Sequence, residues 1–140
     1  MKVLIVGAGI AGPTLAYWLR QSGHEITLVE RAPALRRGGY LVDFWGAGFD
    51  VAERMGILPE VKRRGQVFTE ARAIDAAGRR IGSLKPTAIM GGGRYVSVPR
   101  SDLAAVIYAA LDSSVELILD DTVEVLDDGG QSVHVTLARG

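Results

Sequence analysis

Three glycines within six positions near the N-terminus constrain this chain more than any other feature of its sequence. They lie in VGAGIAGPTL, residues 6–15. The apolar, β-branched run Lys2–Val6 before them is typical of a strand buried in a parallel sheet. A helical pattern follows from about Ile10 to Gln21 and ends at a Ser-Gly pair, which is a common helix stop. The glycines therefore fall in the turn between a strand and a helix.

Each glycine of this turn has a separate role in binding a dinucleotide. Gly7 permits the sharp turn, a side chain at Gly9 would collide with a diphosphate, and one at Gly12 would hold the helix off the strand. The helix N-terminus directs its N–H groups and positive dipole toward the phosphates. Pro13 fits there because an N–H in the first turn has no intrahelical partner. The cofactor-binding residues predicted in this turn are Gly7, Gly9, Ile10, Ala11 and Gly12.

A carboxylate at the end of the next strand strengthens this interpretation. Ile26–Val29 has the pattern of a second buried strand, so strand, helix and strand form a parallel βαβ unit. Glu30 follows, where a carboxylate accepts hydrogen bonds from both ribose hydroxyls of adenosine and repels a 2′-phosphate. The alternative is a solvated glutamate paired with Arg31. The glycines and Glu30 predict a bound dinucleotide and leave both NAD and FAD open.

Composition narrows the class of protein further. A length of 140 residues suits one domain, and 16 basic residues balance 16 acidic ones, which argues against binding nucleic acid or an anionic membrane. The sequence has no cysteine, so disulfide staples, thiolate metal sites and disulfide-reductase chemistry are excluded. Residues 3–19 carry no charge, but a strand, turn and helix explain this run better than a signal peptide or membrane span. We expect a cytoplasmic protein without a membrane span.

The rest of the chain predicts an α/β fold: a Rossmann-like βαβ domain with a parallel sheet and antiparallel hairpin insertions. Residues 31–48, rich in Pro, Arg and Gly, are predicted to form a loop. Ser101 is predicted to be the N-cap of a helix with one apolar face. The other expected elements are helices at Phe49–Met55 and Pro59–Arg64, strands at Tyr95–Val98 and Val115–Leu119, and hairpins at Phe68–Asp75 with Arg79–Leu84 and at Thr122–Leu126 with Ser132–Leu137.

Most of the chain, to about Val125, resembles a known family. The resemblance is carried by MKVLIVGAGIAGPTLAYWLRQSGHEITLVERAPALRRGGYLVDFWGAGFDVAERMGI and by VPRSDLAAVIYAAL. These stretches are similar to the single-component FAD-dependent monooxygenases, which include the aromatic hydroxylases and the tetracycline-inactivating oxygenases. The resemblance implies FAD as the cofactor. Its most specific parts are Glu30-Arg31, Arg37-Gly38-Gly39 and Arg100-Ser101-x-Leu103.

The resemblance implies further cofactor contacts. In that family the residue after the ribose-binding acid lies near the adenine, and a strand residue after the third parallel strand gives adenine a backbone contact. A glycine-rich loop passes the flavin ring, and an arginine opening a later helix contacts the diphosphate and ribityl chain. The residues implied are Arg31 and Val123 at the adenine, Gly39 and Tyr40 at the flavin ring, Arg100 at the diphosphate and ribityl chain, and Arg37 elsewhere on the cofactor.

Several of these side chains, and others, have plainer interpretations. Arg100 opens a helix, so its charge and the helix dipole act on one anion, but it also fits a surface arginine that caps carbonyls. Arg36 and Arg37 fit solvated loop charges equally well. We interpret the remaining candidates as structural, except that Trp45 also fits the border of a substrate cavity: His24, His134, Asp120, Asp121, Asp127, Asp128, Trp18 and Trp45.

The function that the resemblance implies is a monooxygenase. NADPH or NADH reduces the FAD, which then activates O2 to hydroxylate an aromatic or polyketide-like small molecule. We assign no metal and no catalytic side chain, because the flavin carries the chemistry. An NAD-dependent dehydrogenase module and a non-catalytic nucleotide-binding fragment remain alternatives.

The resemblance also sets expectations for domain organisation. The family places Ile26–Val29 between Lys2–Val6 and Val115–Leu119 in its sheet. The family's Asp-Gly and Gly-Asp motifs are absent, and its members are much longer. We therefore expect residues 1–140 to be the N-terminal part of an FAD-binding domain, inactive alone. Residues 66–98 would begin a substrate-side sheet, and the remainder of the family fold would be missing.

Overall fold

The protein folds into two compact units. The computed structural model describes residues 1–35, 38–90, 92–111 and 113–140. The first unit consists of residues 1–37 and 107–140, and the second of residues 38–106. No helix within the described ranges is both long and apolar enough to cross a membrane. Parallel strands, antiparallel strand pairs and helices together make the fold mixed α/β, as the sequence predicts.

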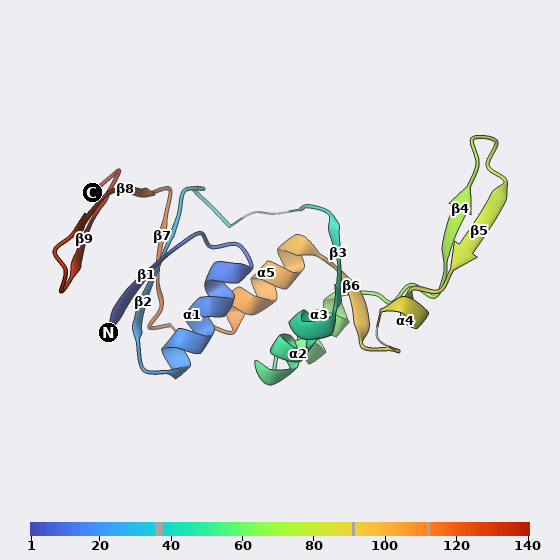
Figure 1. Ribbon diagram of the computed structural model, residues 1–140, viewed down its shortest axis with the longest axis horizontal. Helices are drawn as coiled ribbons and strands as arrows, with labels where there is room; N and C mark the ends of the chain where they lie inside the picture. The colour runs from blue at the N-terminus through green and yellow to red at the C-terminus, as the bar shows by residue number, and fades with distance from the viewer. Residues whose placement is uncertain (36–37, 91, 112) are drawn as a thin grey trace. The chain divides into compact units, whose positions relative to one another are not determined.

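A three-stranded parallel sheet forms the centre of the first unit (Figure 1). β1 (Lys2–Val6) pairs with β2 (Glu25–Glu30), and β2 pairs with β7 (Glu116–Leu119). The strand order is therefore β1-β2-β7. Both the parallel pairing and this order confirm what the βαβ pattern and the family resemblance imply.

α1 (Ala11–Gln21) connects β1 to β2 and packs against one face of this sheet (Figure 1). The helix ends as predicted, because Gly23 has φ +82° and its N–H donates to the Arg20 carbonyl at 3.0 Å. The uncharged run of residues 3–19 thus forms β1, the glycine turn and most of α1, as predicted. The core between helix and sheet consists of Ile5, Ala16, Ile26 and Leu28, with Val3, Leu19, Leu111, Val115 and Leu117 packed around it.

A hairpin lies on the other side of the same sheet. β8 (Val123–Asp128) and β9 (Val133–Leu137) pair antiparallel, close to the predicted boundaries. A cavity of about 1180 Å³ lies between this hairpin and the sheet face opposite α1. Its walls include Leu4, Val6 and Ile118 from the sheet and Leu126 and Val135 from the hairpin.

The second unit is built from antiparallel strand pairs and short helices. β3 (Leu41–Trp45) pairs with β6 (Tyr95–Pro99), and β4 (Ala71–Ile74) pairs with β5 (Arg80–Leu84) in a separate exposed hairpin. The most deeply buried apolar side chains of this unit belong to its helices and to β6. The helices are α2 (Gly46–Arg54), α3 (Leu58–Arg64), α4 (Pro86–Ile89) and the start of α5 (Arg100–Ala109). The buried side chains include Phe49, Val61, Val96, Val98 and Leu103.

The sequence predictions need correction in two places. Residues 31–48 are not all loop, because Leu41–Trp45 form β3 and α2 begins at Gly46. The side chains of residues 41–45 (LVDFW) alternate between more and less exposed, and this two-residue period is typical of a strand. The glycines on either side of the stretch made it resemble a loop. Ser101 is not an N-cap, because α5 begins one residue earlier, at Arg100. Pro99 ends β6 there, so the chain turns directly from strand into helix.

Candidate functional site

The glycine turn between β1 and α1 has the geometry that its spacing predicts. Gly7 has φ +102°, a left-handed conformation that side chains rarely adopt, and its N–H donates to the Val29 carbonyl at 2.7 Å. A Cβ atom at Gly12 would lie 1.9 Å from the carbonyl oxygen of Gly7. A side chain at residue 12 would therefore push α1 off β1. Gly9 lies exposed between these two positions.

The N-terminus of α1 faces this turn without a competing acceptor. Ile10 is the N-cap residue, and no side chain among the described residues caps the helix. Pro13 is fully buried in the first helical turn, while Gly9 and Ala11 are exposed. The first N–H groups of an 11-residue helix thus have no side-chain acceptor of their own. Such a helix end attracts an anion.

The Glu30 carboxylate is fixed by main-chain donors at the end of β2. The N–H of Ala8, inside the glycine turn, donates to Oε2 at 2.9 Å. The N–H of Ala32 donates to Oε1 at 3.0 Å. The side chain is partly buried, and each of its two oxygens accepts one of these main-chain hydrogen bonds. The structure therefore ties the acid to the glycine turn, a link that the sequence spacing suggested but did not specify.

Arg31 and Val123 lie near this end of the sheet. Arg31 is exposed directly after β2, and Val123 is the half-buried first residue of β8. Two main-chain hydrogen bonds join the segment before β8 to the end of β2 and the residues after it. The Asp121 N–H donates to the Glu30 carbonyl at 3.3 Å, and the Asp120 N–H donates to the Ala32 carbonyl at 3.0 Å. Val123 therefore follows closely on a segment bonded to the Glu30 main chain.

Gly39, Tyr40 and Arg100 come together in the second unit. The Arg100 N–H donates to the Tyr40 carbonyl at 3.1 Å, and the guanidinium carbon lies 6.0 Å from the Tyr40 ring centre. Gly39 has φ +123°, and a Cβ there would approach the Arg100 Cβ to 3.7 Å. Tyr40 is 70% exposed, so its ring remains accessible to a ligand. The predictions for Arg36 and Arg37 lie outside the described residues.

Sequence reasoning missed a polar network across the β3–β6 pair. The Tyr95 hydroxyl donates to Asp43 Oδ1 at 3.0 Å, and the Ser97 hydroxyl donates to the same oxygen at 2.8 Å. Burial and the bond to Asp43 raise the pKa of Tyr95. The network joins β3 to β6 and keeps Tyr95 a neutral donor. The alternating exposure of the side chains in residues 41–45 shows that these residues form a strand, with Asp43 on one of its faces.

The acids near β8 and β9 bond within the protein. Asp121 is 8% exposed, and its Oδ1 accepts the N–H groups of Thr122 at 2.8 Å and Arg139 at 3.1 Å. Asp120 pairs with the Arg139 side chain. Asp128 accepts the Gly130 N–H at 2.9 Å in the hairpin turn. These carboxylates therefore stabilise the ends and turn of the hairpin.

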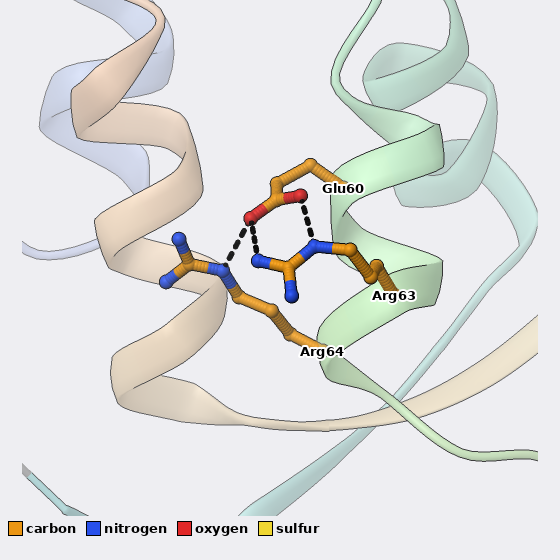
Figure 2. Close-up of polar contacts among 3 residues, drawn as sticks. All are labelled: Glu60, Arg63 and Arg64. Carbon is orange, nitrogen blue, oxygen red and sulfur yellow. Dashed lines mark hydrogen bonds and ion pairs between the residues drawn. The ribbon is translucent and has the colours of Figure 1, made fainter.

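A cluster of three charged residues lies on α3 (Figure 2). Glu60 Oε1 accepts from Arg63 at 2.6 Å and from Arg64 at 2.7 Å, and Oε2 accepts from Arg63 at 2.7 Å. These bonds lower the pKa of Glu60 to about 2. The residues are three and four apart on one helix, so the cluster supports α3 locally.

Comparison with known proteins connects this geometry to a family. A family model described as FAD dependent oxidoreductase matches residues 2–39, which contain the glycine turn and Glu30. An uncharacterised protein of Mycobacterium tuberculosis is 38% identical over 99% of this chain and 38% of its own length. The FAD-dependent monooxygenase asL4 of Sarocladium schorii is 34% identical over 98% of this chain and 33% of its own.

A solved structure agrees with the sequence matches. The tetracycline destructase Tet(51) superposes with a TM-score of 0.80 at 32% identity, covering 99% of this chain and 35% of that protein. The chain is similar in sequence and fold to FAD-dependent monooxygenases. It spans about a third of the length of the relatives it matches. The resemblance to FAD-dependent monooxygenases seen in the sequence is thus confirmed.

Proposed function

We propose that this chain binds FAD through its N-terminal βαβ unit, as part of a flavin-dependent monooxygenase. The observation that carries the proposal is the bond between the Ala8 N–H and the Glu30 carboxylate. It joins the glycine turn, which suits a diphosphate, to an acid that suits a ribose. The two groups therefore form one preorganised surface for the adenosine diphosphate half of a dinucleotide.

In the first unit, each residue has a distinct role toward the cofactor. The exposed backbone at Gly9 and the N–H groups of Ile10 and Ala11 would receive the diphosphate at the start of α1. The ribose hydroxyls would donate to the Glu30 carboxylate, whose orientation the main chain already fixes. Gly7 and Gly12 make the turn possible. Arg31 and the Val123 main chain would lie at the adenine, as the family resemblance implies.

In the second unit, we propose that Gly39 and Tyr40 lie at the flavin ring and that Arg100 binds the diphosphate and ribityl region. The contacts among these three residues support their acting as one group. Arg37 stays a candidate for a further contact. Arg100→Ala should weaken FAD binding at least tenfold, because both the charge and the bidentate geometry are lost. Arg100→Lys should restore only part of this loss.

The proposed reaction is a hydroxylation. When bound, FAD would supply the redox chemistry, with NADPH or NADH as the reductant and O2 as the oxidant. The residues of this chain bind and orient the cofactor, and none is proposed as a catalytic acid or base. The substrate would be an aromatic or polyketide-like small molecule, with residues 66–98 beginning the sheet on its side.

A comparison of nucleotide affinities tests the proposal. We expect the purified chain to bind ADP and FAD, measured by calorimetry and by quenching of flavin fluorescence. NADP⁺ should bind at least tenfold more weakly than NAD⁺, because Glu30 repels a 2′-phosphate. A chain that binds NAD⁺ tightly and FAD not at all would instead be a dehydrogenase-type module. Loss of all nucleotide binding would leave only a structural role.

A further inference from the structure

Two of the proposed cofactor residues lie at adjoining ends of the strands β3 and β6. Tyr40 directly precedes β3, and Arg100 directly follows β6. Within the strand pair, Leu41 lies opposite Pro99. The same register continues one step further, because the Arg100 N–H donates to the Tyr40 carbonyl at 3.1 Å. The position of Tyr40 against Arg100 therefore depends on the register of the strand pair.

The apolar side chains of β3 do not fix this register by themselves. Val42 and Phe44 are half-buried, whereas the residues that alternate with them are exposed. A shift by one residue would exchange the two faces and is therefore disfavoured. A shift by two residues keeps every side chain on its face and keeps the hydrogen-bonding pattern of the strand pair. It would nevertheless move Arg100 about 7 Å along β3, away from Tyr40.

The polar contacts of Asp43 do distinguish these registers. Asp43 lies opposite Ser97, and its Oδ1 accepts the hydroxyls of Ser97 at 2.8 Å and Tyr95 at 3.0 Å. Ser97 is 1% exposed and Tyr95 is 2% exposed. A two-residue shift would place either Pro99 or Tyr95 opposite Asp43, so the short Ser97 side chain would no longer face its acceptor. A buried hydroxyl without an acceptor is costly, and the observed register is therefore favoured.

Ser97 has a second attachment on the other side of β6. Its N–H donates to the Gln66 carbonyl at 2.8 Å, and its carbonyl accepts the Gln66 N–H at 2.8 Å. The position of the Ser97 hydroxyl therefore does not depend on β3 alone. Asp43 sets β3 against a residue that is already held.

We propose that Asp43 is a positioning residue for the flavin end of the proposed FAD site. Its hydrogen bonds from Tyr95 and Ser97 hold β3 in the register that sets Tyr40 against Arg100. Asp43 acts through those two residues rather than by touching the cofactor, and the inference rests on the proposed function of the chain. Loss of its carboxylate should weaken contacts to the flavin half of FAD. Contacts to the adenosine diphosphate half, which are proposed for the first unit, should be spared.

Paired titrations with FAD and ADP separate the two halves of the cofactor. Asp43→Ala should lower the FAD affinity about tenfold or more and change the ADP affinity by less than about twofold, because ADP lacks the flavin half. Asp43→Asn keeps an oxygen that accepts both hydroxyls, so it should bind FAD within about threefold of the natural chain. Asp50→Ala is the matched control. Asp50 is an exposed carboxylate of the same unit that accepts from Arg94 at 2.6 Å, and its loss should leave both affinities unchanged.

Removing the donors in place of the acceptor separates positioning from stability. The double variant Tyr95→Phe with Ser97→Ala leaves neither residue with a hydroxyl that needs an acceptor, and Asp43 is exposed to water, so the fold should persist. The variant also removes both contacts that fix the register. Its FAD affinity should therefore fall as in Asp43→Ala, while its unfolding midpoint in a denaturant titration stays close to that of the natural chain.

Amide hydrogen exchange reports the contact between Tyr40 and Arg100 without any ligand. In Asp43→Ala the Arg100 N–H should exchange about tenfold faster or more than in the natural chain, because its bond to the Tyr40 carbonyl opens more often. The Gly7 N–H, which donates to the Val29 carbonyl in the first unit, is the internal reference and should exchange at the same rate in both proteins.

Three results would overturn the proposal. The first is an equal exchange rate of the Arg100 N–H in Asp43→Ala and the natural chain, which would show that the register does not depend on this carboxylate. The second is an FAD affinity that is unchanged in Asp43→Ala, or that falls together with the ADP affinity, which would deny Asp43 a role at the flavin half. The third is a natural chain that binds neither nucleotide, which would overturn the proposed function itself.

Discussion

Glu30 and Glu60 each accept hydrogen bonds at both carboxylate oxygens, and main-chain donors contribute at Glu30 where side-chain donors contribute at Glu60. Glu30 is held by main-chain N–H groups of Ala8 and Ala32. Glu60 is held by the side chains of Arg63 and Arg64 on its own helix (Figure 2). The Ala8–Glu30 bond spans 22 residues, whereas the donors of Glu60 lie three and four residues away.

The difference separates the proposed cofactor site from an ion-pair cluster on one helix. Main-chain donors are fixed by β1, β2 and the glycine turn, so the Glu30 carboxylate keeps its orientation before a ligand arrives. Arg63 and Arg64, which are at least partly exposed, hold Glu60 only as firmly as their own rotamers allow. We therefore expect changes near Glu30 to alter fold and ligand binding strongly, and changes at Glu60 to alter stability weakly.

The largest effect is expected from Gly12→Ala. The added Cβ would lie 1.9 Å from the Gly7 carbonyl oxygen, a main-chain atom that moves only if α1 separates from β1. The free energy of unfolding should fall by about 3 kcal/mol or more, measured by denaturant titration. Gly82→Ala in β5 is the matched control, because a Cβ there meets nothing within 4 Å. Equal stability of the two variants would contradict the close packing of the turn.

Gly9→Val should abolish nucleotide binding while the fold persists. Gly9 is exposed, so its side chain would enter the space proposed for the diphosphate rather than the core. ADP and FAD affinity should each fall at least a hundredfold in calorimetric titrations, with the unfolding midpoint close to that of the natural chain. Retained affinity would show that the diphosphate lies elsewhere.

Glu30→Ala should have an intermediate effect. A hydrogen bond to a charged group contributes about 1.5–3 kcal/mol, so FAD affinity should fall roughly ten- to a hundredfold. Glu25→Ala, at the exposed start of the same strand, is the control and should bind as the natural chain does. A change of less than about twofold in Glu30→Ala would assign the ribose to another residue.

Glu60→Gln should give the smallest effect, with a defined pH dependence. The pKa of Glu60 is lowered to about 2 by Arg63 and Arg64, so the carboxylate stabilises the fold fully above about pH 4.5. This contribution is lost as pH falls from there through about 2. At pH 7 the melting temperature should drop by at most about 3 °C, and less in 1 M salt. A difference that stays undiminished down to pH 2 would contradict the ion-pair origin.

The βαβ unit was predictable from sequence because every local signal in it agrees. The apolar run of β1, the glycine spacing and the Ser-Gly stop of α1 each mark a boundary to within about a residue. The position of Glu30 at the end of β2 was predictable, while its role toward a ribose stays a prediction. Its bond to the Ala8 N–H was not, because the direction of one N–H in a turn depends on backbone angles that composition does not encode.

The second unit was harder to predict because its signals conflict. Gly38, Gly39 and Gly46 flank β3 and suggest loop, while the short alternation between them suggests strand. Pairing with β6 and the bonds from Tyr95 and Ser97 to Asp43 decide in favour of the strand. These hydrogen bonds join residues more than 50 positions apart in the sequence, so local sequence patterns do not reveal them. The domain boundary near residue 66 and the cofactor roles of Tyr40 and Arg100 stay predictions.

The central claim is that the glycine turn and Glu30 form one preformed site for the adenosine diphosphate half of FAD. The most direct measurement is a titration of the isotopically labelled chain with ADP, followed residue by residue through its amide NMR signals. We predict saturable shifts at Gly9, Ile10, Ala11 and Arg31, and none in β4 or β5. Shifts confined to other residues, or no shifts at millimolar ADP, would contradict the account.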